Sequence, residues 1–341
     1  MNISIFIKSI IAFFLYRRGW IDSKLKQLAK SSYLIITYHR ILSDAELLEN
    51  VEPGMYVELE TFKNHIKWLT KWFDIIPLEE STAAESKNTL SNDRHICSLT
   101  FDDGWRDFYD VCFPVLKKYS IPATVFLPTG YIGTTKQFWT DRFAYILESR
   151  ALREVEIPYG SKVSNLAREI LALRGSLGVR LANGIKILKS YPIPIINEIL
   201  DEVSEILQLA PPERKRVFLS WDEVHEMHDS GIITFGSHTQ NHQILTTLTE
   251  DEIQYELTSS KEDLLRYNVV DSSFIPFCYP NGNYSKKIAE MVRRAGYHLA
   301  ATTRGGWNDA SASPFELKRV SVHQDISSTE PMFMCRLSTI A

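Results

Sequence analysis

Residues 96–105 read ICSLTFDDGW, an apolar run that ends in two adjacent carboxylates, Asp102 and Asp103. A short continuous run of apolar and β-branched residues is typical of a strand covered on both faces, as in parallel sheets. Neighbouring carboxylates repel each other, so a cation, a proton or a metal must stabilise them if they are partly buried. The stretch predicts a buried parallel strand with a polar site at its carboxyl end. A solvated Asp-Asp-Gly turn is the alternative that these ten residues leave open.

Similar runs recur along the chain, and helical patterns lie between several of them. The helical pattern at 220–231, for example, begins with a capping Ser220 and ends at Gly231. Alternating strands and helices predict an α/β fold, and seven or eight strand–helix units predict a barrel. The other runs are YLIITY (33–38), DIIPL (74–78), ATVFL (123–127), IITF (232–235), FIPFC (274–278), HLAATT (298–303) and LKRVSV (317–322).

One long segment interrupts this alternation. Residues 151–216 contain helical patterns separated by prolines and no clear strand, so we expect a helical insertion within the barrel. The predicted organisation is an N-terminal helical segment at 1–30, the barrel at 31–330 with its insertion, and a C-terminal tail at 331–341.

Composition narrows the class of protein. The 341 residues are 44% hydrophobic and 23% charged, which is typical of a globular chain with a sizeable core. The net charge of −4 gives no overall basic surface and argues against nucleic acid as a partner. The four cysteines show no metal-binding spacing and no disulfide framework, so nothing indicates an oxidising compartment.

The N-terminus is apolar from Ile3 to Tyr16, interrupted by Lys8 and followed by the basic pair Arg17-Arg18. A secretory signal places its positive charge first, which this segment does not. As a helix it would extend roughly 21 Å, less than the ~30 Å of a bilayer's hydrocarbon core. We expect a cytoplasmic protein whose residues 3–18 pack on the domain or contact a membrane peripherally.

Polar residues follow several of the predicted strands, where an α/β barrel places its active site. His39 follows the first strand, the Asp pair follows 96–101, His238 and His242 follow 232–235, and His323 follows the last strand. The i, i+4 spacing of His238 and His242 would let both imidazoles face one point on a helical turn. With one carboxylate they form a ligand set suited to Zn²⁺.

The motifs TFDDGW, SHTQNH and YPNG, in this order, resemble those of the polysaccharide deacetylases of carbohydrate esterase family 4, which share the nodulation-type chitooligosaccharide deacetylase domain. Flanking stretches such as ATVFLPTGYIG and LSWDEVHEMHDSG resemble the branch linked to bacterial exopolysaccharide and capsule synthesis. The resemblance extends from about Tyr33 to Asp325.

This resemblance implies a distorted (β/α) barrel that binds one divalent metal and hydrolyses N-acetyl groups on a polysaccharide or its lipid-linked sugar precursor. By motif position, Asp102 would be the general base, and Asp103, His238 and His242 would be the metal ligands. The implied metal is zinc, with nickel or cobalt as alternatives, and the implied partner is an N-acetylated carbohydrate. The implied proton donor to the departing amine is His323.

The chain departs from the family pattern at Cys278, where the third motif commonly has an arginine that orients the base. A cysteine cannot form that ion pair, so another residue must hold Asp102, and Arg304 and Arg319 are the candidates. In the family the acid histidine usually sits in a Leu-x-His motif near the end of the domain. VSVH at 320–323 matches that motif only loosely, because Ser321 stands in place of the leucine.

Further residues on the predicted rim are candidates for binding substrate. Backbone N–H groups near Asn281 would stabilise an oxyanion, aromatic rings there would stack on sugars, and His39 and Asp141 would contact the metal site or sugar hydroxyls. The aromatic candidates are Trp105, Tyr279 and Trp307.

Two other functions stay open from the sequence. A related C–N amidohydrolase acting on a formamido sugar or a small amide would use the same metal and base. A catalytically silent carbohydrate-binding relative would explain the missing motif arginine, although such a protein would be free to lose its metal ligands. The sequence does not indicate an oligomeric state.

Overall fold

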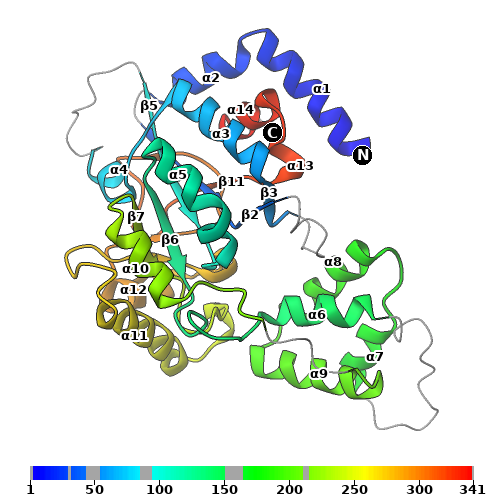
Figure 1. The fold of residues 1–341 in the computed structure, drawn as a ribbon. Coiled ribbons are helices and arrows are strands. Elements are labelled where there is room, and N and C mark those ends of the chain that lie inside the picture. The colour runs from blue at the N-terminus through cyan, green and yellow to red at the C-terminus, as the bar shows by residue number, and fades with distance from the viewer. Residues whose placement is uncertain are drawn as a thin grey trace. The chain divides into compact units, whose positions relative to one another are not determined.

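The computed structural model describes residues 3–29, 32–43, 54–84, 94–149, 164–209 and 215–339. The chain divides into two compact units (Figure 1). The first combines Met1–Thr134 with Phe218–Ala341, and the second is Thr135–Val217.

The first unit is built on a parallel sheet in which neighbouring strands follow the order β1-β5-β6-β7-β8-β9. Each of the eight runs named from the sequence overlaps one strand, and β1 and β5 are buried over almost their whole length. These strands are β1 (Ser32–Tyr38), β4 (Phe73–Ile75), β5 (His95–Phe101), β6 (Ala123–Leu127), β7 (Ile233–Ser237), β8 (Pro276–Cys278), β9 (Leu299–Ala301) and β11 (Val320–Ser321).

The sheet closes on itself through the segment that leads into β11. Ala301 of β9 bridges Leu317 in parallel, and Ile36 and Thr37 of β1 pair with Val320 and Ser321 of β11. The predicted α/β barrel is therefore confirmed, with seven strands in the ring. Because all strands of this ring run in parallel, their carboxyl ends meet on one face of the barrel.

Three short strands were not predicted from the sequence. Strands β2 (Arg40–Leu42) and β3 (Tyr56–Glu58) form a separate parallel pair, and β10 (Asn308–Asp309) pairs with the start of β1 in the antiparallel sense. Strand β4 extends the sheet at the amino-terminal end of β5. The three strands that were not predicted, β2, β3 and β10, each pair two or three residues, which is too few for an apolar pattern to reveal.

Helices follow most strands of the barrel, and some of them begin with side-chain caps. Ser220 and Glu223 form a capping box at the start of α10, and Thr249 and Glu252 form another at the start of α11. The helices are α3 (Leu59–Trp72), α4 (Leu78–Ala84), a π-helical turn at Phe108–Cys112 that continues into α5 (Phe113–Tyr119), α10 (Trp221–Asp229), α11 (Glu250–Arg266) and α12 (Lys286–Arg294).

The two ends of the chain lie together. The N-terminal helices α1 (Ile3–Arg17) and α2 (Trp20–Leu28) contact α14 (Glu330–Leu337), which follows the short α13 (Gln324–Ser327) (Figure 1). The described part of the segment 331–341, expected as a tail, is therefore mostly helical. None of the described helices combines the length and the hydropathy that a membrane crossing requires.

The second unit is helical over its described residues, with its own apolar core around Phe143, Leu188 and Leu200. It contains the segment 151–216 that we predicted as a helical insertion, although residues 151–163 and 210–214 lie outside the described residues. Its helices are α6 (Trp139–Glu148), α7 (Asn165–Leu171), α8 (Leu177–Leu188) and α9 (Ile193–Ile206).

Candidate active site

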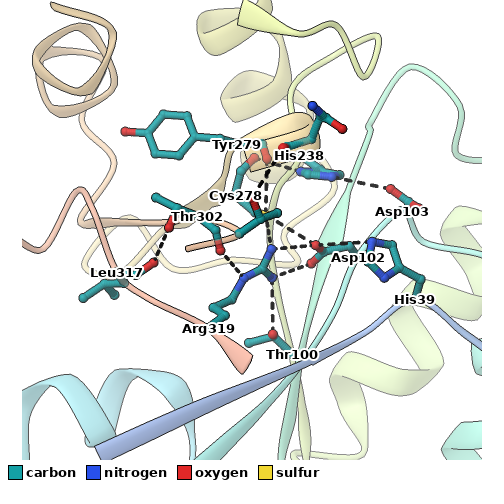
Figure 2. A network of polar contacts seen from close by, with 12 residues as sticks. His39, Thr100, Asp102, Asp103, His238, Cys278, Tyr279, Thr302, Leu317 and Arg319 are labelled. Carbon is teal, nitrogen blue, oxygen red and sulfur yellow. Dashed lines mark hydrogen bonds and ion pairs between the residues drawn. The ribbon is translucent and has the colours of Figure 1, made fainter. Parts of the chain in front are cut away.

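The site begins at the carboxyl end of β5, where the chain leaves the barrel in a sharp turn. Asp102 and Asp103 are both 3% exposed. Asp103 and Gly104 follow each other in the left-handed region, with φ of 75° and 62°. Such conformations cost energy for a residue with a Cβ and gather at functional sites. The turn sends the two carboxylates into different surroundings (Figure 2).

Asp103 faces the two histidines of the loop after β7. Its Oδ1 lies 3.4 Å from Nε2 of His238 and 3.2 Å from Nε2 of His242. The indole nitrogen of Trp105 donates to its other oxygen, Oδ2, at 3.1 Å. One ligand atom from each of the Asp and His residues therefore converges on one point.

The loop that carries the two histidines is irregular and is not the helical turn suggested by their spacing. Thr239 and His242 have φ of 66° and 53°, and these left-handed residues bring the two rings together. The buried carboxylate of Glu256, on α11, holds this loop in place. It accepts hydrogen bonds from the backbone and side-chain nitrogens of Asn241 at 2.7 and 2.8 Å.

The geometry of His238 fits a metal ligand. Its Nδ1 donates to the carbonyl oxygen of Cys278 at 2.8 Å, so in the neutral ring Nε2 carries the lone pair that faces Asp103. A lone pair and a carboxylate oxygen at this separation repel unless positive charge lies between them. Two imidazoles and one carboxylate are a donor set suited to zinc, and the hydrogen bonds to His238 and Asp103 are of the kind that orient metal ligands.

Asp102 faces the barrel interior and forms a buried ion pair with Arg319. The guanidinium donates two parallel hydrogen bonds of 2.7 Å, from Nη1 to Oδ1 and from Nη2 to Oδ2 (Figure 2). Arg319 is 1% exposed, and its Nε donates to the carbonyl oxygen of Thr302 at 2.9 Å. The pair is therefore held by several hydrogen bonds and shielded from bulk water.

The surroundings keep both carboxyl groups ionised. Burial alone would raise the pKa of Asp102, but the charge and hydrogen bonds of Arg319 outweigh it and lower that pKa. Burial would likewise raise the pKa of Asp103, but His238 and His242, when their rings are protonated, donate to it and hold that pKa well below its usual range. Both acids are thus ionised, and they differ in their partners: a guanidinium for Asp102 and two imidazoles for Asp103.

Arg319 contacts Asp102 in place of the arginine that the third motif commonly has at the position of Cys278. The Cys278 thiol lies beside the Arg319–Asp102 pair, with its Sγ 3.1 Å from Nη2 and 3.6 Å from Oδ2. Of the two arginines proposed to hold Asp102, only Arg319 contacts it. Arg304 instead lies near the surface, with its Nη1 3.0 Å from the Tyr284 hydroxyl and 3.5 Å from Glu316.

Of the two histidines predicted at the rim, His39 lies near Asp102 and His323 lies near Asp325. Nε2 of His39 is 3.9 Å from Oδ2 of Asp102, and its side chain is 23% exposed. His323 caps the start of α13 with a side chain 25% exposed and its Nδ1 3.9 Å from Asp325. Burial lowers the pKa of His323, Asp325 opposes this, and the nearby basic groups Arg336, His39 and Lys8 lower it further.

The aromatic candidates are placed differently from our expectation. Trp105 is buried, stacks on Phe218 and supports Asp103. Tyr279 is fully buried and its hydroxyl donates to the carbonyl oxygen of Phe315, and Trp307 is buried with its indole nitrogen bonded to Leu337. These three rings have no open face for a sugar, because each packs in the core.

The remaining candidates are Asn281 and Asp141. Asn281 is exposed in the turn after β8, with φ of 55°. Asp141 lies in the first turn of α6 in the second unit. Their roles on the substrate stay predictions.

Glu256 was not identified from the sequence, although a signal for it exists. It stands among Ile253, Leu257 and Leu264 on the buried face of α11, where an acid must have a partner.

Comparison with known proteins supports the same conclusion as the motifs. Residues 90–300 match the family model described as "Polysaccharide deacetylase". A similar curated relative is the poly-beta-1,6-N-acetyl-D-glucosamine N-deacetylase of Staphylococcus epidermidis, 34% identical over 128 residues. That match covers 33% of this chain and 42% of the relative, so the chain spans less than half the length of that protein.

Solved structures resemble the fold over most of the chain. The deacetylase PplD of Streptococcus pyogenes, solved in complex with acetate, superposes with a TM-score of 0.55 at 22% identity, covering 87% of this chain and 95% of PplD. IcaB from Ammonifex degensii gives a TM-score of 0.55 at 18% identity, covering 92% and 99%. At these identities the likeness shows a shared fold.

Proposed function

Because this chain belongs to the polysaccharide deacetylase family, we propose that it hydrolyses N-acetyl groups on a polysaccharide or its lipid-linked sugar precursor and releases acetate. The main support for the proposal is that two adjacent buried carboxylates have different partners. Asp102 is paired with a guanidinium, whereas Asp103 faces two imidazole nitrogens. Metal-assisted amide hydrolysis can use one carboxylate as the base and another as a metal ligand, and these two carboxylates differ in that way.

Asp103, His238 and His242 would hold a divalent cation, for which zinc suits the donor set best. A cation held there would act as a Lewis acid on the acetamide carbonyl and stabilise negative charge on its oxygen. Trp105 and the carbonyl oxygen of Cys278 fix the orientation of two of the ligands.

Asp102 is the proposed general base. Arg319 engages both of its oxygens, which fixes the plane of the carboxylate and keeps it ionised at neutral pH. Each oxygen retains a lone pair that can accept a proton from an attacking water. A base held this firmly loses little entropy in the transition state.

The departing sugar amine needs a proton, and His323 is the proposed donor. His39 is a second candidate, because its Nε2 lies within 3.9 Å of Asp102. The two are distinguished by comparing His323→Gln and His39→Gln. Loss of the acid lowers kcat by a factor of about 10² to 10⁴, whereas loss of a substrate contact chiefly raises KM.

The test measures metal content and acetate release on the same preparations. The parent chain, Asp103→Ala and Asp102→Asn are purified and analysed for zinc, nickel and cobalt, then assayed on N-acetylated oligosaccharides. We expect about one metal per chain in the parent, loss of metal in Asp103→Ala, and retained metal without activity in Asp102→Asn. Asp110→Asn, a half-exposed acid paired with Arg106, is the control and should behave as the parent.

Two outcomes favour the other functions. Metal binding without acetate release from any N-acetylated sugar points to a C–N amidohydrolase with a different substrate. Sugar binding without metal and without hydrolysis points to a carbohydrate-binding protein. We also propose that the protein is cytoplasmic, which cell fractionation tests.

A further inference from the structure

The exposed apolar surface of the described residues is concentrated at the N-terminus. Seven of the twelve large hydrophobic side chains that are at least 40% exposed belong to α1 and the first residue of α2. Isolated exposed hydrophobics are common on soluble proteins, but a contiguous group marks a surface that binds something. The seven are Phe6, Ile7, Ile10, Ile11, Phe13, Phe14 and Trp20.

Helix α1 is apolar on both of its faces. Its inner face contacts α14, where Ala12 is 4% exposed and the hydroxyl of Tyr16 donates to Glu330 at 2.8 Å. Its outer face carries Phe6, Ile10 and Phe13 at i, i+4 and i+7, a spacing that places them in one stripe. The protein therefore covers one face of α1 and leaves the other in water.

The charge of this region differs in sign from that of the chain. Residues 3–29 contain five lysines and arginines against a single acid, Asp22, whereas the whole chain has a net charge of −4. Arg17 ends α1 and Arg18 follows it, both are exposed, and the nearby Trp20 is 61% exposed. A helix with an apolar face, flanking cations and a nearby tryptophan has the chemistry that lies flat in the interface of an anionic membrane.

We propose that α1 is a docking surface for a lipid bilayer with anionic headgroups, lying in the membrane plane with its outer face among the acyl chains. A protein surface is a poorer occupant, because apolar contact with a protein does not by itself require the cations that flank the patch. At 15 residues α1 extends roughly 22 Å, which suits an in-plane helix.

Docking by α1 would bring the membrane close to the active-site rim. Lys8, Ile11 and Ala12 of α1 line an apolar cavity of about 170 Å³ together with Ile326 of α13 and residues of α14. His323 lies at the start of that same helix α13. If the proposed deacetylase function holds, this position selects substrates carried at a membrane surface, such as a lipid-linked sugar precursor.

The test measures vesicle binding without reference to activity, so that it stays separate from the proposed function. The full chain is sedimented with vesicles of phosphatidylcholine alone and of phosphatidylcholine with phosphatidylglycerol. Ile7→Gln/Ile10→Gln/Phe14→Gln removes apolar side chains from the exposed face, and Arg17→Gln/Arg18→Gln removes two charges. Tyr119→Gln/Tyr255→Gln is the control, since both side chains are exposed hydrophobics on other helices.

We expect the parent and the control to bind vesicles that contain phosphatidylglycerol, and binding to weaken with added salt. The triple variant should bind at least tenfold more weakly, because its three glutamines bury much less apolar surface in the bilayer than the side chains that they replace. Each removed arginine should weaken binding roughly fivefold at low salt. Circular dichroism and thermal unfolding confirm that the variants stay folded, as expected for exposed positions.

Three results would overturn the proposal. The parent could fail to bind vesicles of either composition, or the triple variant could bind as the parent does. Light scattering could also show that the parent is a dimer and the triple variant a monomer while neither protein binds vesicles, which would assign the face to a second copy of this chain.

Discussion

The ion pair between Arg319 and Asp102 supplies the most direct test of how the site is held. In Arg319→Met the carboxylate of Asp102 stays buried at 3% exposed but loses both hydrogen bonds of 2.7 Å. Hydrogen bonds to charged groups contribute about 1.5–3 kcal/mol each. Removing one partner of a buried pair costs about 3–5 kcal/mol, because an uncompensated charge is left behind. We expect the free energy of unfolding to fall by that amount.

A double-mutant cycle separates this coupling from general damage. Asp102→Asn leaves Arg319 unpaired, and the double variant Asp102→Asn/Arg319→Met removes both charges. If the pair acts as a unit, the double variant is more stable than the sum of the single effects predicts, by about 2–3 kcal/mol. Equilibrium urea unfolding with a chelator present measures the cycle, since bound metal would otherwise add to the stability of the folded state.

Arg304→Met is the matched control, because Arg304 is 56% exposed and its partners are Tyr284 and Glu316. It should change the midpoint of unfolding little, as exposed ion pairs usually do. The reasoning is refuted if Arg319→Met unfolds at the urea concentration of the parent, or if the two single effects simply add.

Three further outcomes follow from buried polar groups. Trp105→Phe removes the donor to Asp103 and should weaken zinc affinity by roughly tenfold to a hundredfold in a chelator competition, with the fold unchanged by circular dichroism. Glu256→Gln replaces one acceptor of Asn241 by a donor and should speed amide exchange across the 238–242 loop; unchanged exchange would show that the loop is held elsewhere. His65 is buried with its pKa lowered from 6.5 to about 4, mainly by burial, so the unfolded chain takes up its proton first as the pH falls. Stability should therefore drop by up to about 3 kcal/mol between pH 6.5 and pH 4, and His65→Gln should flatten that drop.

The strands of the barrel could be predicted because their signal is local. Each buried parallel strand needs apolar side chains on both faces, which leaves a run such as ICSLTF in the sequence. The meeting of Asp103 with His238 and His242 could be predicted for a related reason, since parallel strands deliver whatever follows them to one face. The irregular path of the 238–242 loop could not, because it depends on Glu256, which lies on α11.

The sequence analysis left both Arg304 and Arg319 as candidates, because both stand at strand ends. Which arginine reaches Asp102 depends on which side chains of each segment face the barrel interior. That in turn depends on how the segment pairs with its neighbouring strand. Arg319 lies between Leu317 and Val320, which are 2% exposed, whereas Arg304 lies in a glycine-containing loop. A cation flanked by buried apolar residues must find a buried partner, and this would have favoured Arg319. The same dependence on register hid the burial of Tyr279.

The position of Arg319 shows how a barrel can hold Asp102, the proposed base, without an arginine at the motif position of Cys278. The strand ends form a ring, so a side chain that points inward from any strand reaches the same small volume. Cys278 occupies the motif position on β8, and its small side chain leaves room for the guanidinium that enters from the β11 side, 3.1 Å away. An arginine at position 278 would place a second buried guanidinium against the first. The small Cys278 side chain and the inward-pointing Arg319 therefore belong together. The lack of an arginine at position 278 is no evidence that Asp102 lacks a cationic partner.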